Sequence, residues 1–410
     1  MMTQVDVVIV GGGMAGLALA SALAGSGLRI EVLEKQLPLG PETWSDGFDP
    51  RVSAITRASE NILRFCGAWD FIESQRIAPY ADMDVWDGEG TGNIQFHASE
   101  ASVEYLGHII ENRVIQYGLY LACQAHENIT INAQGMDQLS RENGTWLVTL
   151  EDKTQLLPTL LVGADGGHST IRERTGFSVR EWDYGHNGVV TTVETEKPHG
   201  NVARQPFLAT GPLGVLPLRQ KLSNEESHLS SIVWSADTKT AAELMAMDEA
   251  TFNHALTVAL EGRLGKVVRS ERRFSFPLQQ RHATDYISDN VALVADAAHT
   301  LHPLAGQGIN MGFLDAAVLA EEVSNSVRRG LSPIEPMGLK RYQRRRKGHN
   351  LMMMSTMEGF KRLFDVVPMP LRLLRNQGMS LLNEHPIAKG HILKHAMGFA
   401  GDLPEAAQSA

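Results

Sequence analysis

Three stretches of the chain repeat one order of hydrophobic and polar positions: a short apolar run, a turn that contains glycine, and a helical or basic segment. The apolar runs lie at residues 7–10, 160–162 and 290–295. Each has the composition and length of a strand that is buried on both faces of a sheet. The pattern therefore predicts three buried strands whose carboxyl ends carry the turns.

Alternation of apolar and polar residues appears between these runs and predicts strands that are buried on one face. The alternating segments span residues 81–98, 187–196, 205–219 and 228–235. The first of them alternates around glycine-rich turns and reads as a hairpin. We assign these segments to a second, mostly antiparallel sheet, with one helix over residues 240–262 packed on it.

Composition then excludes several classes of protein. The 410 residues are enough for two or three domains, and a net charge of −10 disfavours nucleic acid as a partner. Two cysteines, Cys66 and Cys123, cannot form a disulfide framework and fit a reducing cytoplasm. We expect no transmembrane helix, because the longest uncharged run, residues 7–28, is divided by glycines and reads as a strand, a turn and a short helix. The N-terminal run, interrupted by Asp6, reads as a strand and not as a signal peptide.

The first strand continues into a dinucleotide-binding pattern. Gly11, Gly13 and Gly16 have the spacing GxGxxG ahead of an apolar helix, and Glu34 ends the next apolar run, residues 28–33. The first glycine permits a tight turn, the second lets the backbone approach a pyrophosphate, and the third lets the helix pack close to the strand. The helix N-terminus favours phosphate, and the acid is placed to bind ribose hydroxyls. The pattern alone does not separate NAD from FAD.

The third strand ends on Asp296, at the edge where ligands of open α/β sheets collect. His299 and His302 follow it, and a metal site would need both to converge with a further ligand. Pro303 argues against the continuous helix that would bring them together, so we interpret them as structural or hydrogen-bonded groups.

Two glycines, Gly306 and Gly308, then lead into an apolar helix predicted at residues 310–323. The lysine and hydroxyl of a GxxxxGK[ST] phosphate loop are absent. The N-terminus of the helix would instead stabilise negative charge on a larger bound group, such as a reduced flavin.

These motifs, GGGMAG, GADGGHSTIR and ADAAHTLHPLAGQGINMG, in this order resemble the aromatic-ring flavoprotein monooxygenases of the para-hydroxybenzoate hydroxylase type. The similarity extends over nearly the whole chain. Residues 296–315 are similar to the hallmark DAAHxxHPLAGQGxNxGxxD of the ubiquinone-biosynthesis hydroxylases. Stretches such as LGHIIEN (106–112) and SSIVWS (230–235) resemble the 2-octaprenylphenol hydroxylase branch.

The resemblance implies an α/β fold: a Rossmann-like FAD-binding domain, an inserted antiparallel-sheet substrate domain and a C-terminal helical segment. The expected division is residues 1–80, 100–180 and 277–330 for the FAD-binding domain, 81–99 and 181–276 for the substrate domain, and 331–410 for the helical region.

The resemblance also implies roles for individual residues. Arg51 and Arg113 match arginines that face the cofactor, Asp165 belongs to a shared motif near FAD and the pyridine nucleotide path, and Asp296 matches the aspartate that binds the ribityl chain. The residues matched beside the isoalloxazine ring are Pro303, Gly306, Gln307, Gly308, Ile309 and Asn310. One departure is Ala295, where the family usually has glycine, which puts the local packing in question.

The implied enzyme is an FAD-dependent monooxygenase that hydroxylates the ring of a polyprenylated phenol, similar to 2-octaprenylphenol, in ubiquinone biosynthesis. NAD(P)H reduces FAD, and O2 then forms a C4a-hydroperoxyflavin that attacks the ring. We expect Pro303 and Gln307 to lie beside the reacting groups, and His299 is the candidate base for the phenol. No metal is expected.

Three alternatives stay open: a hydroxylase of another ring position or another aromatic compound, an FAD-dependent prenyl reductase, and a non-catalytic flavoprotein scaffold of a biosynthetic complex. The sequence does not fix the ring position, the length of the prenyl chain, NADH against NADPH, or the oligomeric state.

The C-terminal part, helical from about residue 335, combines a basic run at residues 341–347 with a stretch rich in methionine, phenylalanine and leucine. One interpretation is a helix packed on the FAD-binding domain with a solvated charged face. The other is an apolar surface that admits a polyprenyl tail near anionic lipid headgroups. We expect a cytoplasmic protein, and we leave open a peripheral contact with the inner face of the membrane, a ubiquinone-biosynthesis complex and a homo-oligomer.

Overall fold

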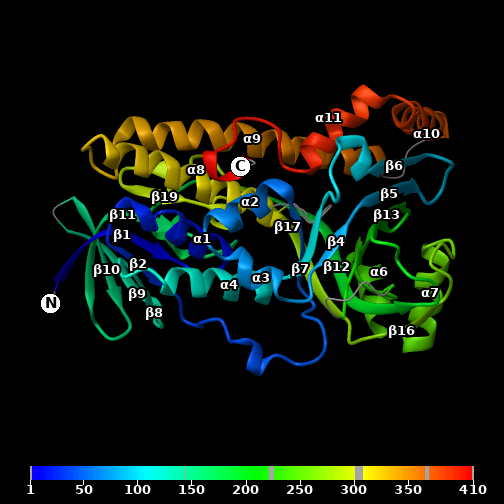
Figure 1. The fold of residues 1–410 in the computed structure, drawn as a ribbon, viewed down its shortest axis with the longest axis horizontal. Coiled ribbons are helices and arrows are strands. Elements are labelled where there is room, and N and C mark those ends of the chain that lie inside the picture. The colour runs from blue at the N-terminus through cyan, green and yellow to red at the C-terminus, as the bar shows by residue number, and fades with distance from the viewer. Residues whose placement is uncertain (1, 143, 221–225, 301–307, 365–368, 409–410) are drawn as a thin grey trace.

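The computed structural model describes residues 2–142, 144–220, 226–300, 308–364 and 369–408. Figure 1 shows a layer of helices, α8 and α9, along one long side of the molecule. One sheet lies beneath the left part of this layer, and a second large sheet occupies the right part of the molecule. A small third sheet lies between the two.

The first sheet has a parallel core. Strand β1 pairs in parallel with β11 on one side and β2 on the other, and β19 and β8 extend the parallel order outwards. Short antiparallel strands flank it. The side chains of Val7, Val8 and Ile9 are fully buried, as is usual for a strand with helices on both faces. The strands are β1 (Met2–Val10), β2 (Ile30–Leu33), β8 (Ile129–Asn132), β9 (Met136–Glu142), β10 (Thr145–Leu150), β11 (Gln155–Gly163), β18 (Ile287–Ser288) and β19 (Val291–Leu293).

The second sheet is mostly antiparallel and centres on the long strand β12, which pairs with β15, β16 and β17. The hairpin β5–β6 joins it through a parallel pairing of β5 with β13. Helices α6 and α7 cover this sheet, where Phe252 and Leu256 pack in one cluster with Trp86 and Val189. The strands are β5 (Asp82–Asp87), β6 (Asn93–His97), β12 (Val179–Thr195), β13 (Val202–Leu208), β14 (Gly211–Pro217), β15 (Leu229–Asp237), β16 (Val267–Ser270), β17 (Phe274–Ala283) and β20 (His299–Thr300).

The small sheet consists of β3 (Val52–Thr56), β7 (Gly107–Glu111) and β4 (Ala78–Tyr80), all paired antiparallel. Helix α1 packs between the first sheet, α4 and α8, and most of its residues are buried because it is apolar on every side. The helices are α1 (Met14–Ala22), α2 (Arg57–Phe65), α3 (Trp69–Glu73), α4 (Asn112–Gln124), α5 (Thr170–Arg174), α6 (Thr238–Ala246), α7 (Glu249–Ala259), α8 (Gly308–Arg328), α9 (Pro336–Phe364), α10 (Met369–Asn383) and α11 (Pro386–Ala396).

The α/β fold, the hairpin and the strands predicted at residues 187–196 and 228–235 are confirmed. The alternating segment 205–219 consists of two antiparallel strands, the end of β13 and β14. The single helix predicted over residues 240–262 was wrong. Met247 has an extended backbone, and Asp248 caps a new helix by accepting a hydrogen bond of 2.7 Å from the Thr251 backbone N–H. The apolar residues keep a helical spacing across this break, which is why the pattern concealed it.

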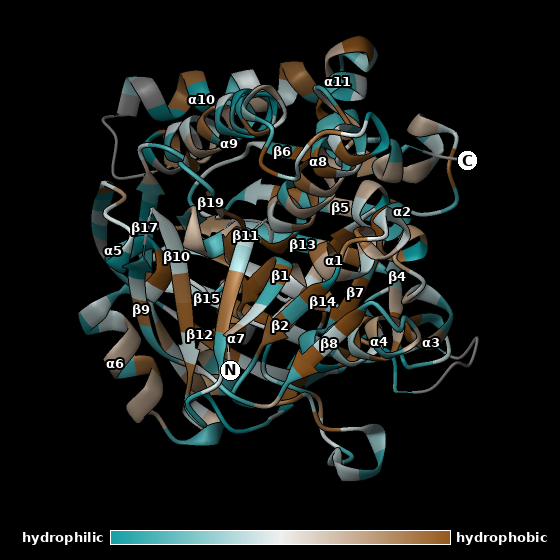
Figure 2. Cartoon of the chain, turned by 90° about the vertical axis from the view of Figure 1, so that its left-hand side faces the viewer, coloured by the Kyte–Doolittle hydropathy of each residue, from teal (hydrophilic) through white to brown (hydrophobic). Residues whose placement is uncertain are grey.

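Smaller differences occur at the third turn and the C-terminus. Strand β19 ends at Leu293, earlier than predicted, and α8 is longer than the predicted helix at both ends. The helical C-terminal region is confirmed. In the side view of Figure 2, α9, α10 and α11 lie above the sheets. No helix within the described part of the chain combines the length and hydropathy needed to cross a membrane.

Candidate active site

The glycine-rich turn between β1 and α1 owes its shape to close backbone contacts. Gly11 has φ of 107°, and a Cβ atom there would lie 2.3 Å from the carbonyl oxygen of Ala164, which directly follows the neighbouring strand β11. A Cβ on Gly16 would lie 1.9 Å from the carbonyl oxygen of Gly11. Side chains are therefore excluded at both positions by packing, as the predicted roles of the first and third glycines require.

Gly13 differs from these two glycines. No heavy atom of the described residues lies within 4 Å of the place its Cβ would occupy. Gly13 is also the N-cap of α1, and no side chain caps the free N–H groups of the first turn. Space and unpaired donors thus coincide where a phosphate would approach the helix.

Glu34 lies directly behind this turn. Its Oε2 accepts a hydrogen bond of 2.8 Å from the Gly12 backbone N–H, and its Oε1 accepts one of 3.0 Å from Gln36. The carboxylate is therefore fixed beside the glycine turn, at the end of β2. This is the place where the sequence pattern predicted a ribose-binding acid.

Asp165 follows β11, and the adjacent Ala164 donates a backbone hydrogen bond of 2.8 Å to Val10 of β1. The carboxylate of Asp165 accepts hydrogen bonds from the Ser169 hydroxyl and from the Ile171 backbone N–H. It thereby organises the start of α5. The structure brings Asp165 close to the Gly11 turn, where it acts as a turn and helix-start residue.

The third turn is strained at Ala295. Its φ is +53°, a left-handed conformation that costs a residue with a Cβ roughly 1–2 kcal/mol. Its methyl group points at α8, where a Cβ added to Gly312 would lie 2.8 Å from it. The departure from the family pattern therefore falls on a position whose backbone favours glycine, and Gly312 leaves the room for the extra methyl group.

Asp296 comes next and is exposed. The pKa of its carboxyl is nevertheless raised, because surrounding protein atoms desolvate the charged form, while the charges of His299 and Arg51 oppose that shift.

Asp315, buried in the middle of α8, holds this turn from behind. Its Oδ2 accepts hydrogen bonds of 3.0 Å from the Ala295 backbone N–H and 2.5 Å from His299 Nε2. Its Oδ1 accepts hydrogen bonds of 2.7 Å from Arg346 Nε and 3.1 Å from Asn350 Nδ2, both on α9. One carboxylate thus ties the strand-to-helix turn to two helices.

The buried carboxylate of Asp315 is stabilised by positively charged partners. Burial alone would raise the pKa of the Asp315 carboxyl, but the charges of His299 and Arg346 hold it well below its usual range. Both oxygens are occupied, so the network satisfies the requirement that a buried charge be paired and hydrogen-bonded. His299 is itself 1% exposed and is fixed by this contact.

The two predicted arginines lie on the other side of the site. Arg113 donates a hydrogen bond of 2.6 Å to Glu111 and one of 2.8 Å to the Gly47 carbonyl. Glu111 is buried and also pairs with Arg76 at 3.0 Å. Arg51 is exposed and lies over the ring of Phe276, 5.0 Å from its centroid.

Asn310 connects the start of α8 to the small sheet. Its Nδ2 donates to the Ala54 carbonyl at 2.8 Å, and its Oδ1 accepts from the Thr56 backbone N–H at 3.1 Å. Ile309 packs against the main core, and Gly308 begins the helix. Pro303, Gly306 and Gln307, together with His302, lie outside the described residues.

Sequence reasoning missed the residues that hold the site from behind: Asp315, Arg346, Asn350 and Glu111. A signal existed for Asp315, a single carboxylate inside the apolar run of residues 311–320. Nothing in the local pattern connects it with Arg346, because the partners are on different helices.

The donor set fits a bound dinucleotide. The first turn offers open space and free N–H groups at Gly13, and Glu34 lies beside it. The third turn presents the exposed carboxyl of Asp296. Since β1 and β11 are neighbours and β19 pairs with β11, all three turns lie at one edge of the sheet. One elongated ligand can therefore contact all of them.

Comparison with known proteins gives a consistent result. Residues 4–355 match the family described as FAD binding domain. The chain is 34% identical over 394 residues to the 3-demethoxyubiquinol 3-hydroxylase of Escherichia coli, which covers 96% of this chain and 98% of the relative. It is 34% identical over 439 residues to the mitochondrial ubiquinone biosynthesis monooxygenase COQ6 of Xenopus tropicalis, with 95% and 93% covered.

The fold is similar to that of solved structures. The crystal structure of p-nitrophenol 4-monooxygenase PnpA from Pseudomonas putida superposes with a TM-score of 0.77 at 19% sequence identity. The similarity covers 98% of this chain and 99% of that one. At this identity the likeness concerns the fold alone.

Proposed function

The chain belongs to the FAD-binding domain family and, within it, to the ubiquinone-biosynthesis FAD-dependent hydroxylases, and from this premise we propose that it hydroxylates the ring of a polyprenylated precursor of ubiquinone. It is an FAD-dependent aromatic-ring monooxygenase, and NAD(P)H is the reductant typical of its family. The overall reaction consumes the ring C–H, O2, NAD(P)H and a proton, and it yields the ring C–OH, water and NAD(P)+.

The observation that carries the proposal is the meeting of three strand-end turns at one edge of the first sheet. In this proposal Gly11, Gly13 and Gly16 accommodate the pyrophosphate and Glu34 the ribose, while Asp296 binds the ribityl chain. Bound FAD supplies the activation of O2 that no amino-acid side chain can perform.

Further residues orient the cofactor and the reacting ring. We assign Arg51, Arg113, Asp165, Gly306, Gly308, Ile309 and Asn310 to the cofactor site, as the family resemblance implies. Pro303 and Gln307 are proposed beside the reacting ring. His299 was the candidate base; because it is buried and bound to Asp315, we propose that it positions the Asp296 turn.

The domain division expected from the sequence is also part of the proposal, except that β17, which the expected boundary at residue 277 would divide, is placed with the second sheet. The first sheet, with α1 and α8, forms the FAD-binding part, and the second sheet forms the part that covers the substrate. The helices after residue 335 pack across both parts in Figure 1. A peripheral contact with the membrane, which a polyprenyl tail would require, belongs to this proposal too.

Two precursors compete as the substrate. The sequence resemblance predicted 2-octaprenylphenol, whereas the Escherichia coli relative is named for hydroxylation of a demethoxyubiquinol, at a different ring position. Purified protein with FAD and NAD(P)H should be given each compound under ¹⁸O2. We expect one ¹⁸O atom in the ring of the product. Consumption of NADH or NADPH that yields peroxide alone with both compounds would refute the proposal.

The ¹⁸O2 experiment also tests the reductase alternative, and an experiment in cells tests the scaffold alternative. A prenyl reductase would give a product that contains no ¹⁸O and two more hydrogen atoms. A non-catalytic scaffold would support normal hydroxylation in cells whose protein carries Asp296→Ala and has lost FAD. We expect such cells to accumulate the unhydroxylated precursor.

A further inference from the structure

Residues 34–51 form a long connection between β2 and β3. They contain no regular structure other than the short 3-10 helix Pro41–Thr43. Connections longer than about 12–15 residues without secondary structure are uncommon in compact domains, and most of them have a function. Figure 1 shows this connection in blue along the lower side of the molecule, below α4. Its middle part, residues 37–50, is here called the β2–β3 loop, and its ends join Glu34 and Arg51, both proposed to contact the cofactor.

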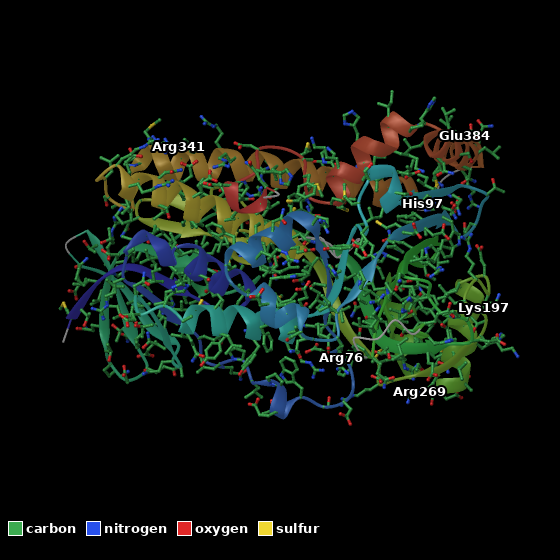
Figure 3. All side chains as sticks on the ribbon, in the orientation of Figure 1. Arg76, His97, Lys197, Arg269, Arg341 and Glu384 are labelled. Atoms are coloured by element: carbon green, nitrogen blue, oxygen red, sulfur yellow. The ribbon has the colours of Figure 1, made fainter. Side chains whose placement is uncertain are left out.

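Two arginines from outside the β2–β3 loop bind its backbone. Arg76 donates hydrogen bonds of 2.7 Å to the carbonyl oxygen of Asp46 and to that of Gly47. Arg113 of α4 donates one of 2.8 Å to the same carbonyl oxygen of Gly47. Figure 3 labels Arg76 beside the loop. Two consecutive carbonyl groups are therefore satisfied by side chains and not by secondary structure.

Glu111, at the end of β7, binds both arginines and the loop itself. Its side chain is 3% exposed and pairs with Arg76 at 3.0 Å and with Arg113 at 2.6 Å. It also accepts a hydrogen bond of 2.7 Å from the Asp49 backbone N–H. Across the described residues, every hydrogen bond between the β2–β3 loop and the chain outside residues 34–51 goes to one of these three side chains. The position of the loop therefore depends on one buried carboxylate and its two partners.

The same arginines also bind aromatic side chains of the loop. The guanidinium of Arg76 lies over the ring of Phe48, 4.0 Å from its centroid, and that of Arg113 lies over Trp44 at 5.1 Å. Trp44 also meets Tyr117 of α4 edge-on, with 6.1 Å between the ring centroids. Contacts of a cation with an aromatic face add to the hydrogen bonds, so the β2–β3 loop lies closed against α4.

Helix α4 holds the loop next to the first glycine turn. Gln116, three residues after Arg113 and on the same side of α4, donates a hydrogen bond of 3.0 Å to the Gly12 carbonyl. The Asn112 backbone N–H donates one of 3.0 Å to the carbonyl of Arg51. Arg113 Nε is buried without a partner among the described residues, so this side chain keeps a donor for a further group. One helix thus connects the loop, the glycine turn and Arg51.

We propose that Glu111 and Arg76 are positioning residues for FAD: they hold the β2–β3 loop closed and thereby slow the release of the cofactor. Neither of them is proposed to touch FAD. They act through the loop, whose ends carry Glu34 and Arg51, and through Arg113. A loop held by few side chains can open without unfolding of the sheets, as lids over ligand sites do. This inference deepens the proposed function and rests on its FAD site.

The test measures how fast the full FAD-loaded chain loses its cofactor, from the recovery of flavin fluorescence after dilution. Arg76→Gln loses hydrogen bonds to two carbonyl groups and should release FAD at least about fivefold faster than the wild type. Glu111→Gln should release FAD at least about tenfold faster, because both arginines lose their charged partner. Arg76→Lys keeps a donor for one carbonyl oxygen, so its rate should lie between those of the wild type and Arg76→Gln.

Proteolysis tests the position of the loop separately. Chymotrypsin cleaves after aromatic residues, and the β2–β3 loop contains two, Trp44 and Phe48. We expect faster cleavage in the loop of Arg76→Gln than in that of the wild type, at a temperature far below the melting of both chains. Equal cleavage would show that Arg76 does not hold the loop.

The matched control is Asp87→Asn. Asp87 of β5 is 2% exposed and pairs with Arg375, but it belongs to the second sheet. This variant should lose stability and yet release FAD at the wild-type rate. If it released FAD as fast as Glu111→Gln, the effect would report general instability and the proposal would be overturned. A wild-type rate of release in Arg76→Gln would also overturn it, whether or not Glu111→Gln folds.

The outcomes for the loop and for the proposed function are separable. A chain whose loop variants release FAD faster, but which hydroxylates no ubiquinone precursor, retains the loop inference and refutes the function. A chain that hydroxylates the precursor, and whose loop variants keep FAD as long as the wild type does, refutes the loop inference alone.

Discussion

The turns after β1 and after β19, which we propose to bind one FAD molecule, are shaped in opposite ways. The first turn removes side chains: Gly11 and Gly16 allow backbone atoms to approach more closely than any Cβ would permit. The turn after β19 is held by a side chain, because Asp315 accepts a hydrogen bond from the Ala295 N–H and is itself bound by Arg346 of another helix. The three glycines after β1 lie within six residues of one another, although Gly11 is also crowded by the distant Ala164. The turn after β19 depends on side chains up to 51 positions from it, from Ala295 to Arg346.

The comparison suggests where each turn is vulnerable. The turn after β1 should be destabilised by a steric clash when a side chain replaces a glycine. The turn after β19 should be destabilised when a buried charge loses its partner. The expected losses in the free energy of unfolding differ in size and in their dependence on pH. Four predictions follow, from the largest expected effect to the smallest.

The largest effect is expected for Asp315→Asn. The change leaves the buried Arg346 guanidinium without its counter-charge, so the free energy of unfolding should fall by about 3–5 kcal/mol. Chemical denaturation measures the loss. The control is Asp289→Asn, which removes an exposed pair with Arg141 at 2.9 Å and should cost less than about 1 kcal/mol. Equal losses in the two variants would show that the contacts of Asp315 do not hold the turn after β19 in place.

The stability of the region around the turn after β19 should also depend on pH. His282 pairs in register with His299 and bonds to the Tyr286 hydroxyl at 3.1 Å. Burial, reinforced by the charges of His299, Lys347 and Arg180, lowers the pKa of His282 to about 4. The unfolded chain therefore takes up a proton that the folded chain refuses.

The sign follows from that difference. The free energy of unfolding should decrease as the pH falls from about 6.5 towards 4, by at most about 3 kcal/mol from this group, and should lose no more on its account below pH 4. In His282→Gln the dependence on pH in this window should be shallower. Urea denaturation at a series of pH values gives the slope, and identical slopes for variant and wild type would contradict the assignment.

The turn after β1 should be sensitive to the size of the side chain at its glycine positions. Gly16→Ala places a Cβ against the Gly11 carbonyl and should destabilise the chain by about 1–3 kcal/mol. Gly13→Ala meets no described atom within 4 Å, so its melting temperature should stay near that of the wild type while FAD binds more weakly. If Gly13→Ala were as unstable as Gly16→Ala, the open space at Gly13 would not be reserved for a ligand.

The smallest effect is expected where Gly312 of α8 approaches Ala295 in the turn after β19. Gly312→Ala should cost about 1–2 kcal/mol, because its methyl group collides with that of Ala295. Ala295→Gly relieves the left-handed strain and should be neutral or stabilising by up to about 1 kcal/mol. The double variant should recover most of the loss in thermal denaturation. Additive effects would show that the two methyl groups do not meet.

The comparison also explains what could be predicted from the sequence. The GxGxxG turn, its strands and Glu34 were predictable, because each depends on spacing within 35 residues and on backbone geometry that only glycine permits. The strands of the second sheet were predictable from alternation. The break between α6 and α7 was not, since a helical apolar spacing continues across Met247.

The contacts that hold the turn after β19 could not be derived from the local sequence pattern. Asp315 is a lone acid in an apolar helix, and its partners His299 and Arg346 meet it only after α8 and α9 pack together. The pairing of α10 with the β5–β6 hairpin was hidden for the same reason, because Arg372 and Arg375 meet Glu89 and Asp87 only in the folded chain.

The central claim is that both turns bind one FAD molecule, and titration of the apo chain with FAD tests it most directly. Flavin fluorescence should give dissociation constants at least about tenfold higher for Gly13→Ala and for Asp296→Ala than for the wild type while the fold persists. The first variant fills the space of the pyrophosphate, and the second removes a hydrogen-bond partner of the ribityl chain. Asp289→Ala should bind FAD like the wild type. Unchanged affinity in both turn variants would contradict the shared site.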